Sequence, residues 1–316
     1  MNDPRILVVG AGALGSFCGG FLRLAGHDVT LLGRPPHVTR IAERGLAIDG
    51  IFGAARADGF SVATAPSDLR GRFDVVVLAV KSYDVEAAAR SVAATVATDG
   101  AVLALQNGLG HVELLCEIFE AGRVLAAPVL IGATVPEPGS VRVTVYAKPV
   151  KIGSPSPAGY ERALSVAAML AAARIPSEPT DRLLAFLWEK MLYNVPLNAL
   201  GAVLRLAYGA LAERPESRAI MNEAIEEGFA VAAAECSDLL WRSAEECRDH
   251  FYRTLLPPTV AHRSSMLQAI ERGRRTEIDA INGYVCRRGR ALGIATPRNL
   301  TLTGLVRATE GAVSKG

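Results

Sequence analysis

A glycine-rich segment near the N-terminus limits the fold more than any other feature of the chain. Gly10-Ala11-Gly12-Ala13-Leu14-Gly15 has the GxGxxG spacing and follows the apolar, β-branched run Ile6–Val9. A helical pattern rich in small residues continues to about Ala25, and the apolar segment HDVTLLG comes next. In this context the first glycine allows a tight turn, the second lets the backbone approach a pyrophosphate, and the third lets helix and strand pack closely. The pattern predicts a βαβ unit of Rossmann type whose residues 10–15 bind a dinucleotide.

The residue after the second predicted strand indicates which dinucleotide binds. Sites selective for NAD place an acidic side chain here to bind the ribose hydroxyls, whereas NADP sites use a basic one. This chain has Gly33-Arg34 and no acid within reach. A guanidinium binds the additional phosphate in bidentate fashion, although Arg34 could also be an ordinary surface arginine. Its position leads us to predict NADPH as the cofactor.

Two later strands also end in polar residues. FDVVVLAV precedes Lys81, and AVLAL precedes Gln106 and Asn107. Lys81 could be a solvated loop residue and Asn107 part of a turn, but ligands bind at the carboxyl edge of such sheets, so we expect both to face the cofactor. Further strands at 124–135, 140–147 and 148–154 are expected to extend the same sheet, some of them antiparallel.

The composition narrows the class of protein. The chain has 316 residues, half of them hydrophobic, a net charge of +2 and no run of five or six basic residues, which argues against nucleic-acid binding. Its five scattered cysteines contain no CxxC and indicate neither a disulfide framework nor structural zinc. The apolar runs are too short to span a bilayer, and the N-terminus does not read as a signal peptide. We expect a cytoplasmic protein without a metal site or a membrane partner.

The second half of the chain is dominated by helical patterns. RIPSEPT, with two prolines, reads as a linker, so we predict a Rossmann-type α/β domain at 1–178 and an all-α domain at 179–316. The alanine-rich helices are compatible with a homodimer. The expected helices lie at about 181–210, 216–236, 243–254, 262–272, 277–292 and 298–310.

The first of these helices carries a polar stripe among apolar residues. Lys190, Asn194 and Asn198 recur every four residues and therefore share one side of a helix. Pro196 lies within the pattern and predicts a kink or local break near Asn194. The lysine could extend to solvent while the asparagines bond to neighbouring backbone, or the stripe could line a ligand site.

A second stretch, SSMLQAIERGRRTEIDAING, also contains polar residues at unusual places. Ser265 precedes a helical turn, and Glu277 lies near a predicted helix start, where an acid is common. Gly283 inside a helical pattern often marks close packing.

With these pieces in order, the chain resembles the ketopantoate reductase (2-dehydropantoate 2-reductase) family. The matching motifs are GAGALG, VKSYD, QNGLG, WEKMLYNVPLNAL and SSMLQAIERGRRTEIDAING, which run in the family's order from Gly10 to Gly283. The resemblance implies that NADPH reduces the ketone of ketopantoate, a 2-oxo acid, to give pantoate for pantothenate and coenzyme A synthesis. It also implies roles for residues of this chain: Lys190 and Glu277 catalytic, Asn194, Asn198 and Ser265 substrate-binding, and Arg34, Lys81 and Asn107 on the cofactor side.

Four residues depart from the family's pattern. Ala199, Tyr208, His262 and Ala269 stand where relatives often carry proline, asparagine, asparagine and aspartate. These departures bear on the substrate more than on the reaction. The alternatives are a related NADPH-dependent reductase of another 2-oxo or 3-oxo acid, and a non-catalytic NADP(H) sensor.

Overall fold

The chain divides into two compact units in the computed structural model, which describes residues 4–146 and 148–313. The first unit comprises Met1–Gln106 and His111–Leu183, and the second comprises Asn107–Gly110 and Leu184–Gly316. Whereas the sequence analysis places one boundary after residue 178, the chain thus enters the second unit twice.

The first unit is built on a six-stranded sheet in which every neighbouring pair of strands is parallel. The strand order is β5-β2-β1-β6-β7-β8, so the chain builds outward from β1 first in one direction and then in the other. This order confirms the predicted Rossmann-type fold, and it brings the loops after β1, β2 and β6 to one edge of the sheet. The strands are β1 (Arg5–Val9), β2 (Asp28–Leu32), β5 (Ser61–Ala63), β6 (Phe73–Leu78), β7 (Val96–Ala104) and β8 (Val124–Ala126).

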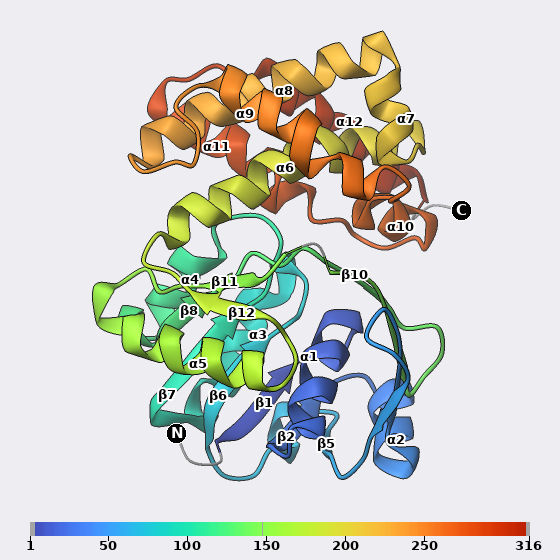
Figure 1. Ribbon diagram of the computed structural model, residues 1–316, viewed down its shortest axis with the longest axis vertical. Coiled ribbons are helices and arrows are strands. Elements are labelled where there is room, and N and C mark those ends of the chain that lie inside the picture. The colour runs from blue at the N-terminus through green and yellow to red at the C-terminus, as the bar shows by residue number, and fades with distance from the viewer. Residues whose placement is uncertain (1–3, 147, 314–316) are drawn as a thin grey trace. The chain divides into compact units, whose positions relative to one another are not determined.

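Helices cover both faces of this sheet (Figure 1). Side chains such as Val8 and Val77 on one face pack in a common core with Phe17 of one helix and Val166 of another. The central strands are buried on both faces, which explains why their sequences are continuous apolar runs. The helices of this unit are α1 (Ala13–Leu24), α2 (Pro35–Arg44), α3 (Val85–Val92), α4 (His111–Ile118) and α5 (Tyr160–Ala172).

The expectation that all later strands extend the main sheet is wrong, because only β8 does so. A second sheet has the order β4-β3-β10-β9, and β11 pairs with β12 in a third. In β10, Val141 and Val143 are buried while Arg142 and Thr144 are exposed, a pattern that suits a sheet with one face in solvent. The predicted linker, residues 174–180, contains the short strand β12. Ala147, the last residue of the strand predicted at 140–147, lies outside the described residues. These strands are β3 (Leu46–Gly50), β4 (Ala55–Ala57), β9 (Ile131–Thr134), β10 (Ser140–Tyr146), β11 (Val150–Ile152) and β12 (Ser177–Pro179).

The second unit is helical, and its most buried element is α6. Residues 191–200 of α6 are all buried, and Gly228 of α8 lies against Leu192 so closely that a Cβ there would be 3.0 Å from a leucine methyl group. Asn282 Nδ2 donates to the Val195 carbonyl (3.0 Å) and to Asn299 Oδ1 (2.9 Å), which ties α6 to α11 and α12. The helices are α6 (Leu183–Leu204), α7 (Tyr208–Glu213), α8 (Pro215–Glu235), α9 (Ala244–His250) with a π-helical turn η6 (Phe251–Leu255), α10 (Ser265–Glu271), α11 (Asn282–Leu292) and α12 (Pro297–Val313).

Three details of the helical prediction are wrong. The pattern at 181–210 is two helices, because Arg205 adopts a left-handed conformation (φ 56°) and Leu206 N–H donates to the Gly201 carbonyl (3.2 Å), closing the end of α6. Of the kink or local break predicted at Pro196, the break is absent, because α6 is continuous through this residue. A 3-10 turn, η8 (Ile278–Ala280), follows Glu277, and the α-helix begins only at Asn282. Within the described ranges, no helix is both long and apolar enough to cross a membrane.

Candidate functional site

The glycine-rich loop after β1 is held tightly against the adjacent strand end. The N–H groups of Gly10 and Ala11 both donate to the Leu32 carbonyl, at 2.9 and 3.2 Å. Gly10 has φ 95°, and a Cβ there would lie 2.8 Å from the backbone nitrogen of Val80. Only glycine fits this position, because the positive φ angle is unfavourable for other residues and the backbone of Val80 leaves no room for a side chain.

The start of α1, immediately after this loop, has the properties of an anion site. No side chain caps its N-terminus, and its first turn contains no acidic residue, so its unpaired N–H groups and the positive end of the helix dipole are available. A Cβ built on Gly12 meets no atom within 4 Å. The predicted segment Gly10–Gly15 therefore has open space and backbone donors where a pyrophosphate group fits.

Arg34 lies just beyond β2, at the position before the first turn of α2. Its side chain is exposed and has no hydrogen-bond or ion-pair partner among residues 4–146 and 148–313. Because no carboxylate in the described part of the chain pairs with it, the guanidinium is available to an anionic group.

The buried side chain of His37, which the sequence analysis did not single out, holds α1 and α2 together beside the glycine-rich loop. Gly139 N–H donates to His37 Nδ1 (3.0 Å), which leaves the ring hydrogen on Nε2, and Nε2 then donates to Ser16 Oγ (2.8 Å). Burial lowers the pKa of His37, in keeping with this neutral tautomer. The bond to Ser16 joins the first turns of α1 and α2, which follow the glycine-rich loop and Arg34, and the bond from Gly139 ties His37 to the turn before β10. A lone histidine in an amphipathic helix gives no sequence signal for such a role.

The other residues predicted on the cofactor side follow β6 and β7. Lys81 is exposed and directly precedes a 3-10 turn after β6. The side chain of Gln106 donates to the carbonyls of Leu78 (2.9 Å) and Val80 (3.1 Å), joining the ends of the two strands. Asn107 follows directly but groups with the second unit. The structure thus places the glycine-rich loop, Arg34 and Lys81 on neighbouring loops of one sheet, with Asn107 in the other unit.

In the second unit, the predicted stripe on α6 consists of one ammonium group and two buried amides. Lys190 is half-buried, and its Nζ lies 5.0 Å from the centre of the Tyr193 ring. Asn194 and Asn198 are 3% and 4% exposed. Asn194 Nδ2 is buried and has no hydrogen-bond partner among the described residues. A buried amide left without an acceptor costs about 1–3 kcal/mol, so this donor is available to an acceptor.

The remaining predicted substrate residues lie on other elements of the second unit. Ser265 is the exposed first residue of α10, whereas its neighbour Ser264 is buried. Ser264 Oγ accepts a hydrogen bond from Leu267 N–H (3.0 Å) and donates to the Asn198 carbonyl (3.3 Å), so this serine caps α10 and joins it to α6. Glu277 is buried at the start of η8. The structure places Lys190, Asn194 and Asn198 on one helix, with Ser265 and Glu277 on separate segments.

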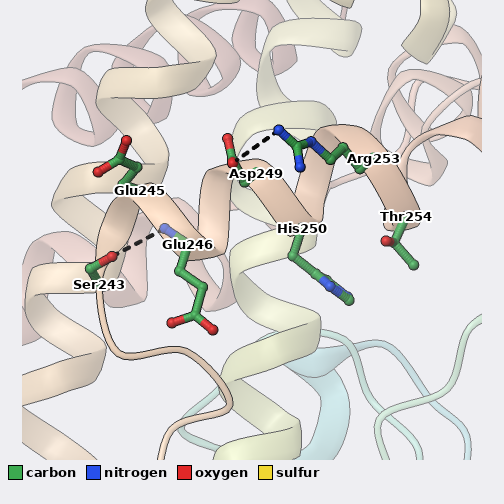
Figure 2. A pocket seen from close by; sticks show the side chains of 7 residues that line it. All are labelled: Ser243, Glu245, Glu246, Asp249, His250, Arg253 and Thr254. Carbon is green, nitrogen blue, oxygen red and sulfur yellow. Dashed lines mark hydrogen bonds and ion pairs between the residues drawn. The ribbon is translucent and has the colours of Figure 1, made fainter.

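A surface depression on the second unit lies apart from all predicted site residues. It is lined by polar side chains between Ser243 and Thr254, among them Glu245, Glu246 and Asp249 (Figure 2). His250 and Arg253 also line it, and none of the predicted site residues does. In the described part of the chain, no group of three or more His, Cys, Asp or Glu residues is arranged to hold a metal ion.

Comparison with known proteins identifies the family from both halves of the chain. The model of the family described as "Ketopantoate reductase PanE/ApbA" matches residues 6–157, and that of its C-terminal part matches residues 182–310. The chain belongs to the ketopantoate reductase family. As a member of this family, it is an oxidoreductase of the 2-dehydropantoate 2-reductase type.

Individual relatives of this ketopantoate reductase family member match over nearly its full length. The 2-dehydropantoate 2-reductase of Aquifex aeolicus is 36% identical over 307 residues, covering 97% of both chains. That of Halobacterium salinarum is 38% identical over 308 residues, covering 97% of this chain and 99% of the relative.

Solved structures give the same family and show its diversity. A PanE/ApbA family ketopantoate reductase from Ralstonia eutropha has a TM-score of 0.86 and 36% identity, covering 98% of this chain and 99% of the other. A D-mandelate dehydrogenase with NADH and anilino(oxo)acetate has a TM-score of 0.89 and 26% identity, with the same coverage. Similar folds in this group therefore act on different 2-oxo or 2-hydroxy acids.

Proposed function

We propose that this protein reduces 2-dehydropantoate to pantoate with NADPH, as an enzyme of pantothenate and coenzyme A biosynthesis. The observation that carries the proposal is the buried, unpartnered Nδ2 of Asn194 beside Lys190 and Asn198 on α6. These three side chains offer hydrogen-bond donors and one positive charge. A 2-oxo acid has the complementary chemistry, because its carboxylate and ketone oxygens are all acceptors.

The proposed chemistry divides between the residues by their type. When bound, the cofactor supplies hydride to the ketone carbon, and negative charge then develops on the ketone oxygen. Lys190 stabilises this oxygen and donates the proton to it. Asn194 and Asn198 fix the substrate without adding charge, and Ser265 contributes a further hydroxyl donor. Glu277 accepts a hydrogen bond from the primary hydroxyl of the substrate.

A second candidate is reduction of a different 2-oxo acid by the same mechanism. It is favoured by the structural similarity to D-mandelate dehydrogenase and by Tyr208 and His262, two of the expected departures from the family's pattern. A non-catalytic NADP(H) sensor has less support, since it has no use for the donor set on α6.

The test is steady-state oxidation of NADPH with 2-dehydropantoate beside a panel of simpler 2-oxo acids. We expect the highest kcat/KM with 2-dehydropantoate. A higher value with another oxo acid would favour the second candidate, and tight NADPH binding without turnover on any of them would favour the sensor.

Replacing Arg34 with alanine is expected to weaken NADPH binding about tenfold or more while changing NADH binding little. The reason is the loss of charge-assisted hydrogen bonds to the additional phosphate. Dissociation constants for both cofactors, measured by fluorescence titration, check the prediction. Arg44→Ala, at the other end of α2, is the matched control, and equal weakening of both cofactors by R34A would contradict the selecting role.

Replacing Gly12 with alanine is expected to weaken cofactor binding about tenfold while leaving thermal stability within about 2 °C of the original. The added methyl group meets no protein atom, so the fold tolerates it, but it occupies space proposed for the pyrophosphate. Gly304→Ala on α12 is the control, because a Cβ there also meets nothing within 4 Å. Unchanged NADPH affinity in G12A would contradict the proposed position of the phosphates.

A further inference from the structure

The amide of Asn198, unlike that of Asn194, is already engaged on one side. The hydroxyl of Tyr208 donates to Asn198 Oδ1 at 2.7 Å, and Tyr208 is only 3% exposed. Burial raises the pKa of Tyr208 well above its ordinary value, so the phenol keeps the proton that it donates. Asn198 Nδ2 donates to no residue in the part of the chain that the structure describes.

The tyrosine itself is fixed from several directions. Tyr208 N–H donates to the His262 carbonyl (3.0 Å), and the ring packs edge-on against the rings of His262 (5.2 Å) and Tyr193 (6.2 Å). Tyr193 in turn lies beneath the ammonium group of Lys190. The phenol is therefore held in one place by backbone and aromatic contacts within the same group of residues as the proposed catalytic lysine.

This arrangement has a consequence for the orientation of the Asn198 amide. A free carboxamide can rotate to present either its oxygen or its nitrogen to a ligand. With Oδ1 directed at the phenol, the carboxamide is fixed in one orientation, and the two N–H donors of Nδ2 face away from Tyr208. In this orientation Asn198 presents donors and complements an acceptor oxygen.

We propose that Tyr208 is a positioning residue that fixes the Asn198 carboxamide with its N–H donors toward an acceptor oxygen of the 2-oxo acid. This inference rests on the proposed function. Tyr208 would determine whether Asn198 presents hydrogen-bond donors or an acceptor to the substrate. His262 and Tyr193 hold the ring of Tyr208, and the hydroxyl acts on the substrate only through Asn198.

The test is the Tyr208→Phe variant, which keeps the ring and removes only the hydroxyl. We expect KM for the oxo acid to rise about threefold to tenfold, the scale of one hydrogen bond, while kcat and the NADPH dissociation constant stay within twofold of the original. The rise in KM should be equal for 2-dehydropantoate and for an oxo acid that lacks its hydroxyl group. In an Asn198→Ala background, Y208F should change KM no further, because the residue through which it acts is gone.

A matched control separates positioning from a structural role. Tyr252 donates a hydrogen bond to Asn222 Oδ1 at 2.8 Å, the same pair of groups elsewhere in the second unit. We expect Y252F and Y208F to lower thermal stability by similar amounts, because each loses one hydrogen bond, but only Y208F to raise KM.

The outcomes distinguish this inference from the proposed function. Turnover in the original protein together with an unchanged KM in Y208F overturns the inference alone. A KM effect that persists in the N198A background, or that appears only with the hydroxylated substrate, also overturns it. Absence of turnover on the whole panel of oxo acids overturns the proposed function and this inference together.

Discussion

Replacing Lys190 with alanine is expected to lower kcat by about a hundredfold or more while NADPH affinity stays unchanged. The size follows from the usual contribution of a general acid. Lys190 lies on α6 in the second unit, whereas the glycine-rich loop and Arg34 belong to the first, so its loss should affect the chemical step and not the cofactor. Single-turnover kinetics under saturating NADPH and oxo acid measure that step directly.

Two further variants make the Lys190 result specific. Lys190→Met keeps most of the side-chain volume and should lose as much activity as K190A. Lys151→Ala removes a lysine that pairs with Glu178 in the first unit and should keep normal turnover. Activity of K190A within a few-fold of the original would remove Lys190 from the mechanism.

Replacing His111 with phenylalanine is expected to make the first unit more resistant to acid. His111 is buried at the start of α4, and neither ring nitrogen has a partner among the described residues. Burial lowers its pKa from 6.5 to about 4. As the pH falls below about 6.5, the unfolded chain takes up a proton that the folded chain does not, so stability is lost between about pH 6.5 and pH 4. The full difference corresponds to about 3 kcal/mol.

The measurement is the free energy of unfolding in urea at pH 7 and pH 4. Both tryptophans, Trp188 and Trp241, lie in the second unit, so a probe located in the first unit is needed. Circular dichroism combined with hydrogen exchange of the α4 segment follows unfolding around His111. His111→Gln, which is polar but does not titrate, should share the flatter pH dependence of H111F even if it is less stable at pH 7. Parallel pH profiles for all three proteins would contradict the prediction.

The parts of the fold that could be predicted from sequence are those in which a local pattern is compatible with only one type of secondary structure. The run Ile6–Val9 followed by GxGxxG predicts a strand, a tight turn and a helix, and the structure contains all three. The helices of the second half were found for the same reason, since their periodic apolar positions need a core. The stripe on α6 could be found because three polar residues recur at the helical period.

The remainder depends on contacts that the sequence does not encode locally. An alternating strand such as β10 indicates one exposed face, but not that its neighbours are β3 and β9. The end of α6 at Arg205 carries no glycine or proline signal, because an arginine takes the left-handed position. The bonds from Tyr208 to Asn198 and from His37 to Ser16 join side chains on separate elements. Such pairs appear only when the elements are packed together.

The segment Asn107–Gly110 has a consequence for how this chain can be divided or recombined. Leu109 N–H donates to the carbonyl of Ala280 (3.0 Å), and Gly110 lies beside the ring of Tyr284. A gene fragment that begins at Leu184 lacks these four residues, so its Ala280 carbonyl loses a donor and part of the Tyr284 ring loses its cover. Residues before and after Leu184 therefore cannot be exchanged between relatives as two independent pieces. A chimera that takes the helical half from one relative must take this tetrapeptide from the same relative.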